Sequence, residues 1–383
     1  MKRFFVLILA LLLLLPACAA EPVATEPVLT MPPTDPTTAP AATEPVATEP
    51  VTEPVTEPTT EPAPTAPEPT EPVVLYRHPL NGRPIDEPFN GRLMAVVINN
   101  VVYALPQHGI SSADMIFELE TEGGVTRQLA IFTELDKVSK IGPIRSARTY
   151  FNAIAKSFDA PIAHCGSSYV AGQGYLDYFK TKSSPWLHLD SHFAGKYFYR
   201  DKDRLSKGFA TEHTLFTTGE KLLSAMENRD YNKTYEGGLD FGFSFADNIN
   251  LNGETANSIT VTFNGSKKMK FTYDANEGVY NASQYGKKYV DGNTGSSVDF
   301  KNVLVLFASQ KKVKSEYGNH SFYTLTGSGK GYYACNGQVI PIKWKHSKYS
   351  DPFSFTTEDG EPITLGVGES YVGITSVKKL AYE

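Results

Sequence analysis

The sequence predicts an α/β or α+β N-terminal domain followed by a β-rich C-terminal domain, both behind a signal peptide and a long linker. Three observations predict this organisation: a charged and then apolar N-terminus, a proline-rich stretch without a core, and packed-domain periodicity from residue 93. The 383 residues are 41% hydrophobic and 12% aromatic, which excludes a wholly disordered chain. Three cysteines are too few for a disulfide-dense scaffold.

Residues 1–17 have the pattern of a signal peptide. Lys2 and Arg3 precede an apolar run, residues 4–15, which is too short to cross about 30 Å of hydrocarbon as a helix. Leu15-Pro16-Ala17-Cys18 then resembles a bacterial lipoprotein cleavage site, whose cysteine thiol is lipidated. We expect a lipid on Cys18; the alternative is an ordinary secretory signal with an incidental cysteine. In both cases the protein is exported.

Residues 18–74 are predicted to be a disordered linker of Pro, Thr and Glu. Within them, residues 21–72 hold 15 of the 26 prolines and 10 of the 42 acidic residues, and no Lys, Arg or aromatic residue. Such a composition favours extended polyproline II, with a contour of roughly 160 Å. We expect a spacer that carries the folded part into the cell wall; a proline-rich ligand for a partner domain is the alternative.

Beyond the linker the charges almost cancel, with 34 Lys and Arg against 32 Asp and Glu. A nucleic-acid partner would require a clustered basic excess, so we expect no nucleic acid among the partners.

Residues 75–225 predict the α/β domain. The apolar run 93–98 predicts a strand buried on both faces, and residues 114–120 and 127–132 predict a hairpin joined at Gly123-Gly124. Gly142-Pro143 is a plausible helix start, and apolar residues at helical spacing after it predict a core-facing helix. Residues 161–165 predict a further strand.

After a connecting segment, 226–244, residues 245–383 predict the β-rich domain. Runs of β-formers alternate with Gly, Asn and Asp, and lie at residues 258–263, 269–273, 303–307, 331–337 and 338–344. Gly327-Ser-Gly-Lys-Gly331 lacks the spacing of a phosphate-binding loop, and we expect a hairpin turn there.

The segment Ile141-Gly-Pro-Ile-Arg-Ser-Ala-Arg148 contains the most informative charges. If the helix begins at Gly142-Pro143, Arg145 and Arg148 lie on one face at its positive end, where each cation opposes the macrodipole by about 0.3–1 kcal/mol. We therefore expect anionic partners for both. One interpretation is a phosphate or carboxylate ligand held by Arg127, Arg145 and Arg148.

The other interpretation is an internal network without a ligand. Asp114, Glu118 and Glu120 are separated by even spacings, so they share one face of the first hairpin strand, and Arg127 on the return strand is expected near them. Buried carboxylates could then neutralise the arginines. The same three acids are candidates to hold a divalent cation such as magnesium, the one cofactor that the sequence leaves open.

Four other residues are weaker candidates. Arg200 and Arg204 lie beside aromatic residues, which suits stacking on a ligand as well as surface packing. His164 and His213 are candidates for an accessory role, although isolated histidines are usually only hydrogen-bonded. Cys165 follows His164, but strand neighbours point to opposite faces, which disfavours a thiol nucleophile.

The sequence leaves open whether Cys165 and Cys335 form a disulfide. The sequence contains no Ser elbow, HExxH, P-loop or CxxC motif, and no catalytic residue or definite metal ligand is identified from it.

A series of ordered motifs resembles the YerB-like bacterial lipoproteins over about residues 75–380. In the first region the motifs are Val97-Ile-Asn-Asn100, Ser112-Ala-Asp-Met-Ile-Phe-Glu118, Glu122-Gly-Gly-Val-Thr-Arg127, Ile141 to Arg148, and His213-Thr-Leu-Phe-Thr217. In the second they are Asn336-Gly337, Ile342-Lys-Trp-Lys345, Asp359-Gly360 and Gly366-Val-Gly368. The resemblance implies a two-domain exported lipoprotein whose function is largely unknown. The chain departs from the family at Glu212-His213-Thr214, where a Pro and an Asn usually flank the His.

A second similarity concerns the layout of charged residues. Asp114 before a strand, a basic residue opening the next strand, and arginines entering a helix are similar in layout to LytR-CpsA-Psr phosphotransferases. Those enzymes use acids, arginines and a divalent ion on polyprenyl pyrophosphate.

Three functions follow as hypotheses. The first is a lipid-anchored module on the extracytoplasmic face of the cell membrane that binds an anionic cell-wall or polyprenyl-phosphate ligand, or an envelope protein. The second is a metal-assisted phosphotransferase with Asp114 and Glu118 on the ion. The third is a non-catalytic structural adaptor.

Overall fold

The computed structural model describes residues 76–167, 188–192, 194–229, 239–315 and 318–383, all within one compact unit, Glu71–Glu383. The predicted signal peptide, Cys18 and the linker lie outside the described residues, as does part of the connecting segment 226–244. None of the described helices combines the length and apolar character needed to cross a membrane.

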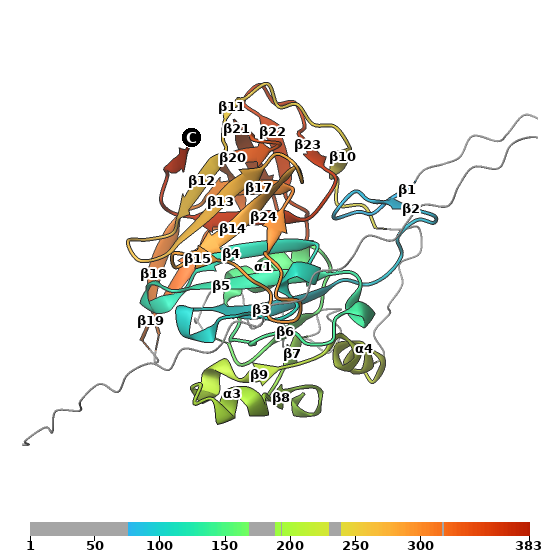
Figure 1. Cartoon of the computed structure of the whole chain (residues 1–383), viewed down its shortest axis with the longest axis vertical. Helices are drawn as coiled ribbons and strands as arrows, with labels where there is room; N and C mark the ends of the chain where they lie inside the picture. Colours follow the sequence, from blue (N-terminus) through green and yellow to red (C-terminus); the bar gives the residue numbers. More distant parts are fainter. Residues whose placement is uncertain (1–75, 168–187, 193, 230–238, 316–317) are drawn as a thin grey trace, which may run out of the picture. The chain divides into compact units, whose positions relative to one another are not determined.

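The first region contains short helices and strands, which Figure 1 draws in blue to green. Its strands are β1 (Tyr76–Arg77), β2 (Pro84–Ile85), β3 (Met94–Asn100), β4 (Met115–Glu120), β5 (Thr126–Phe132), β6 (Ile162–His164), β7 (His188–Asp190), β8 (Tyr199–Arg200) and β9 (Leu215–Phe216). Its α-helices are α1 (Thr149–Ser157), α3 (Lys202–Ser206) and α4 (Gly219–Glu227). Its 3-10 turns are η1 (Val102–Ala104), η2 (Ile110–Ser112), η3 (Glu122–Gly124), η4 (Leu135–Lys137), η5 (Gly195–Tyr197) and η6 (Thr211–His213).

The second region is built of strands in its described residues, which confirms the predicted β-rich character. Its first strands are β10 (Ser244–Ala246), β11 (Glu254–Thr255), β12 (Ser258–Thr262), β13 (Lys268–Asp274), β14 (Val279–Gln284), β15 (Lys287–Lys288), β16 (Asp299–Phe300) and β17 (Asn302–Phe307). The remaining strands are β18 (Gln310–Ser315), β19 (Gly318–Tyr323), β20 (Gly327–Cys335), β21 (Gln338–His346), β22 (Ser354–Thr357), β23 (Thr364–Gly366), β24 (Ser370–Thr375) and β25 (Leu380–Tyr382).

One eleven-stranded sheet takes strands from both regions, in the order β11-β21-β20-β17-β24-β4-β5-β3-β6-β7 with β22 paired to β21. The regions meet where β24 pairs parallel to β4, with Ser370 opposite Met115 (Figure 1). The predicted hairpin is confirmed, because β4 and β5 pair antiparallel across η3. The predicted two-faced burial is also confirmed, because all seven residues of β3 are buried.

The two faces of this sheet have separate cores. On one face, α1 packs through Phe151 and Ile154, together with its C-cap Phe158, against residues such as Val97 of β3. This confirms the predicted core-facing helix. The other face is covered by α4 and by the second sheet, β15-β14-β13-β12-β25 with β16 on β14. There the alternating buried residues of β12 and β13 pack in the same core as Ile116.

The predicted helix start at Gly142-Pro143 is wrong. Helix α1 begins at Thr149, and Arg148 is its N-cap with an extended backbone (φ −132°, ψ 159°). The preceding segment is extended because its main chain bonds to strands: Arg145 N–H donates to Val97 O at 2.9 Å, and Ile144 bridges Ile98. Sheet hydrogen bonds outweigh the local helix signal, and Arg145 lies outside the helix.

The predicted turn at residues 327–331 is also wrong, because these residues open strand β20. The hairpin turn between β20 and β21 lies instead at Asn336-Gly337, where both residues have positive φ (49° and 72°). The glycines of β20 serve close packing: a Cβ on Gly331 would lie 2.4 Å from Val305 O.

Candidate functional site

Glu118 is fully buried between the two sheets and accepts hydrogen bonds from both regions. From the first region, Asn100 Nδ2 (2.9 Å) and Thr126 Oγ1 (2.6 Å) donate to Oε1, and Gln128 Nε2 (3.2 Å) donates to Oε2. From the second region, Lys267 Nζ lies 3.2 Å from Oε1 and Tyr371 OH donates to Oε2 at 3.0 Å. This saturated carboxylate is a structural group, because a buried charge needs such partners.

The other two candidate acids lie in separate networks. Asp114 accepts from Asn81 Nδ2 (2.7 Å) and from the main-chain N (3.0 Å) and hydroxyl (2.7 Å) of Thr133. Glu120 accepts from Asn264 Nδ2 at 3.0 Å. The described residues hold no cluster of three His, Cys, Asp or Glu side chains suited to a metal ion. The three candidate acids therefore lie in separate networks and do not converge on one site.

The structure brings Arg127, Arg145 and Arg148 close enough for the charges of Arg145 and Arg148 to act on Arg127. Arg127 pairs with Leu119 on β4, so its side chain cannot share the face of Glu118 as the sequence suggested. Its Nη1 donates to Ser146 O at 2.5 Å, and no described carboxylate lies within 4 Å. Burial and the charges of Arg148 and Arg145 lower the pKa of Arg127 to about 9, which leaves it protonated at neutral pH.

Arg148 is compensated inside the protein. Its Nε and Nη2 donate to the Glu122 carboxylate at 2.6–3.0 Å, and Nη1 donates to Ala147 O at 2.7 Å. Glu122 also accepts from Ser321 N (3.0 Å) in the second region. Arg148 is therefore neutralised inside the protein, as the second interpretation expected, but by Glu122 and not by Asp114, Glu118 or Glu120.

Arg145 lines an open pocket of about 380 Å³, here called the Arg145 pocket. The Arg145 side chain is 32% exposed, and the carboxylate of Glu212, a half-exposed residue, lies 3.9 Å from its guanidinium. A pair this exposed and this long contributes little. The other lining residues come from η1, the hairpin turn, η6 and the second region: Val101, Val102, Tyr103, Gly123, Gly124, Val125, Glu212, His213, Ser266, Lys267 and Tyr285.

Lys267 lies at the edge of this pocket and is 1% exposed. Its ammonium lies 4.6 Å from the Tyr285 ring centroid and contacts the Gln284 amide oxygen and Glu118. Burial lowers the pKa of Lys267, and the charge of Glu118 opposes that shift. The residue therefore links the pocket to the buried carboxylate.

Arg204 and Arg200 do not line the Arg145 pocket. The Arg204 guanidinium donates to the carbonyls of Ala104 (2.9 Å), His213 (3.1 Å) and Pro106, and lies 4.9 Å from the ring centroids of Phe209 and Phe216. Backbone carbonyls and aromatic rings therefore occupy the buried Arg204 guanidinium, which corrects its suggested contact with a ligand. Arg200 is exposed and donates to Thr211 O at 2.5 Å.

The two candidate histidines lie apart. His213 lines the pocket and its Nδ1 accepts from Asn99 Nδ2 at 2.9 Å; burial lowers its pKa. His164 is fully buried, donates from Nδ1 to Gly166 O (2.7 Å), and its Nε2 lies 2.5 Å from His188 Nδ1. Cys165 and Cys335 are both free thiols, so they do not form a disulfide with each other in this structure.

Sequence reasoning missed Lys267, Tyr285 and Glu122. Lys267 follows Gly265-Ser266 and precedes another lysine, which is the pattern of an exposed turn. Glu122 was seen only as part of the hairpin turn. Their roles depend on partners far along the chain, and only the hydrogen-bonding requirement of a buried Arg or Glu could have signalled that partners existed.

The Glu122–Arg148 pair makes stability depend on pH. Burial alone would raise the pKa of Glu122, but the hydrogen bonds and charge of Arg148 outweigh burial and lower it from 4.5 to about 2. The folded state then binds this proton more weakly than the unfolded state, so the contribution is complete above about pH 5 and is lost as pH falls towards 2. It amounts to roughly 2–3 kcal/mol.

We predict that Glu122→Gln lowers the free energy of unfolding at pH 7 by that amount and flattens its decline between pH 5 and 2. Urea unfolding at several pH values measures this, with the exposed Glu361→Gln as the matched control. A variant whose pH dependence parallels that of the wild type would contradict the assignment.

Comparisons of the sequence and of the structure with known proteins point to the same family. The N-terminal domain model of a protein of unknown function (DUF3048) matches residues 80–232, and the C-terminal domain model matches residues 259–372. The putative lipoprotein YerB of Bacillus subtilis is 32% identical over 302 residues, which cover 77% of this chain and 85% of that protein.

A crystal structure of the YerB protein from Bacillus subtilis superposes with a TM-score of 0.67 at 25% identity, and the match covers 80% of this chain and 99% of that one. The resemblance to YerB-like proteins is thereby confirmed. The two domain models together span most of the folded part, and the chain belongs to the DUF3048 family of YerB-like proteins.

Proposed function

We propose that this protein is a membrane-tethered envelope lipoprotein that binds an anionic ligand in the Arg145 pocket. The name of the Bacillus subtilis relative, a putative lipoprotein, supports the tether together with Cys18 behind the apolar run 4–15. The composition of residues 18–74 suits a spacer between lipid and folded part.

An excess of positive charge supports the anion. Three guanidinium groups, those of Arg127, Arg145 and Arg148, lie close enough for the charges of the other two to lower the pKa of Arg127. The described carboxylates within 4 Å of them are Glu122 and Glu212, and the second is solvent-exposed. Lys267 adds no net charge because Glu118 neutralises it.

The pocket suits a phosphate or carboxylate at the end of a larger ligand. Arg145 is the lining guanidinium, and its planar fork can hold such a group with two parallel hydrogen bonds. The flanking Tyr103 is 76% exposed and offers an aromatic surface beside the charge. A cell-wall polymer or a polyprenyl phosphate has this chemistry. Binding without turnover is proposed, because the predicted acids are occupied elsewhere.

We expect inorganic pyrophosphate, used as the probe, to bind the full-length protein in detergent, and Arg145→Ala to weaken the affinity about 10- to 100-fold. Calorimetry measures both. Arg200→Ala removes an exposed arginine that does not line the pocket and is expected to change the affinity less than twofold. Equal affinities for wild type and Arg145→Ala, or no binding of pyrophosphate, would refute the proposed site.

The tether has its own test. Cys18→Ser is expected to move the protein from the membrane fraction to the soluble extracytoplasmic fraction, and mass spectrometry of the wild type is expected to find a diacylglyceryl group on Cys18. Because Cys165 and Cys335 lie in the folded part, Cys165→Ser serves as the matched control. A wild-type Cys18 without lipid would contradict the anchor and leave the pocket proposal unaffected.

A further inference from the structure

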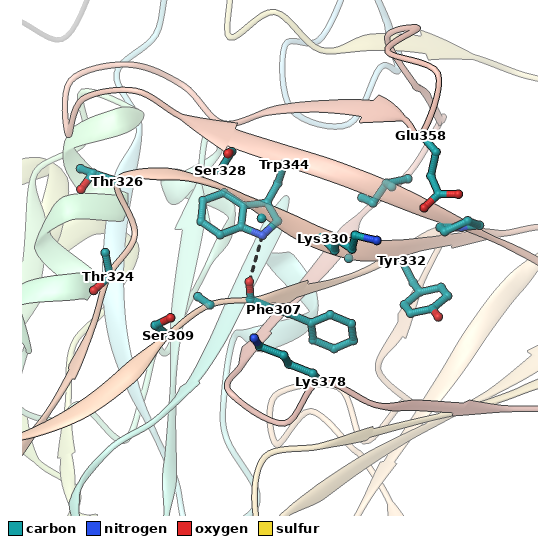
Figure 2. A pocket seen from close by; sticks show the side chains of 15 residues that line it. Phe307, Ser309, Thr324, Thr326, Ser328, Lys330, Tyr332, Trp344, Glu358 and Lys378 are labelled. Carbon is teal, nitrogen blue, oxygen red and sulfur yellow. Dashed lines mark hydrogen bonds between the residues drawn. The ribbon is translucent and has the colours of Figure 1, made fainter.

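A second pocket, of about 460 Å³, lies in the second region between β17, β20 and β21. Figure 2 shows it from close by. Gly329 and Gly331, part of the glycine-rich segment that the sequence suggested was a turn, contribute to its wall. None of its lining residues lines the Arg145 pocket, so the two pockets are separate.

Aromatic side chains form one part of this pocket. Trp344 is 3% exposed and its indole Nε1 donates to Phe307 O at 3.2 Å (Figure 2). A Cβ on Gly329 would lie 2.6 Å from that Nε1, so the indole requires a glycine opposite it. Phe307 and Tyr332 are half-buried, with ring centroids 6.0 Å apart in an edge-to-face arrangement. Their remaining surface offers apolar contact to a ligand.

Hydroxyl groups form another part. Side chains of Ser309, Thr324, Thr326 and Ser328 line the pocket, and none of these hydroxyls hydrogen-bonds to a described protein group. Figure 2 shows them along the side of the pocket where Trp344 lies. Each hydroxyl can both donate and accept, so together they can match a ligand rich in hydroxyl groups.

The charges at the pocket are unbalanced. Two exposed lysines, Lys330 and Lys378, line the pocket, and Glu358 is the lining residue that carries a carboxylate. No carboxylate of the described residues lies within 4 Å of either ammonium group. Two cations against one anion favour a ligand that carries negative charge.

We propose that this pocket binds an acidic oligosaccharide. A sugar ring presents an apolar C–H face, which suits Phe307 and Tyr332, and a rim of hydroxyls, which suits the four free side-chain hydroxyls. A carboxylate on the sugar reaches Lys330 or Lys378. The combination of bidirectional hydroxyls with aromatic surface distinguishes this ligand from a purely apolar one, and the lysines distinguish it from a neutral sugar.

The test titrates full-length protein in detergent with a β-1,4-linked tetramer of glucuronic acid and with cellotetraose, its uncharged counterpart. The acidic tetramer is expected to bind at least fivefold more tightly. Tyr332→Leu is expected to weaken both interactions at least tenfold, whereas Lys330→Ala is expected to abolish most of the preference for the acidic tetramer. Lys348→Ala, an exposed lysine that does not line the pocket, is the matched control.

Ser328→Ala, a surface change that leaves the ring contacts intact, is expected to weaken binding about threefold and keeps the test valid if Tyr332→Leu misfolds. Circular dichroism shows whether each variant is folded. Failure of both tetramers to bind, equal affinities for the two, or folded Lys330→Ala and Ser328→Ala proteins that bind like the wild type would overturn the proposal. Pyrophosphate binding at the Arg145 pocket would be unaffected by any of these outcomes.

Discussion

The carboxylate of Glu118 is fully buried, so the fold must supply hydrogen bonds and an opposite charge to it. Removing a charge from water costs several kcal/mol unless hydrogen bonds and an opposite charge replace the solvent. Neither region supplies these alone, because the amide donors and the Thr126 hydroxyl come from the first region, while Lys267 and the Tyr371 hydroxyl come from the second. The shared sheet across β4 and β24 brings them together, so the buried charge makes the two regions mutually dependent.

This dependence also places the candidate site. The Arg145 pocket takes its arginine and its glycine turn from the first region, and Lys267 and Tyr285 from the second. Lys267 cannot turn its ammonium toward a ligand without leaving Glu118 unpaired, so it stabilises the wall instead of adding charge. The ligand-directed charge falls on Arg145, because Arg148 is occupied by Glu122 and Arg127 is buried.

Local patterns predicted the local structure. The apolar run of β3, the glycine-containing hairpin of β4 and β5, and the periodicity of α1 each follow from burial of neighbouring residues, and each is confirmed. The start of α1 could not be predicted, because Ile144 and Arg145 are held by strand partners distant in sequence. The parallel pairing of β24 with β4 carries no local signal either. Arg145 and Arg148 stood out because they lie close together in one short segment, whereas Lys267 and Glu122, whose roles depend on distant partners, carried no such signal.

A double-mutant cycle on Glu118 and Lys267 tests this account most directly. The free energies of unfolding of Glu118→Gln, Lys267→Met and the double variant are compared with that of the wild type by urea denaturation. The account predicts that Lys267→Met alone lowers the free energy of unfolding by about 3–5 kcal/mol, because it leaves a buried carboxylate without its opposite charge. It also predicts that the loss in the double variant is smaller than the sum of the two single losses by at least about 2 kcal/mol. Additive single losses below about 1 kcal/mol each would contradict it.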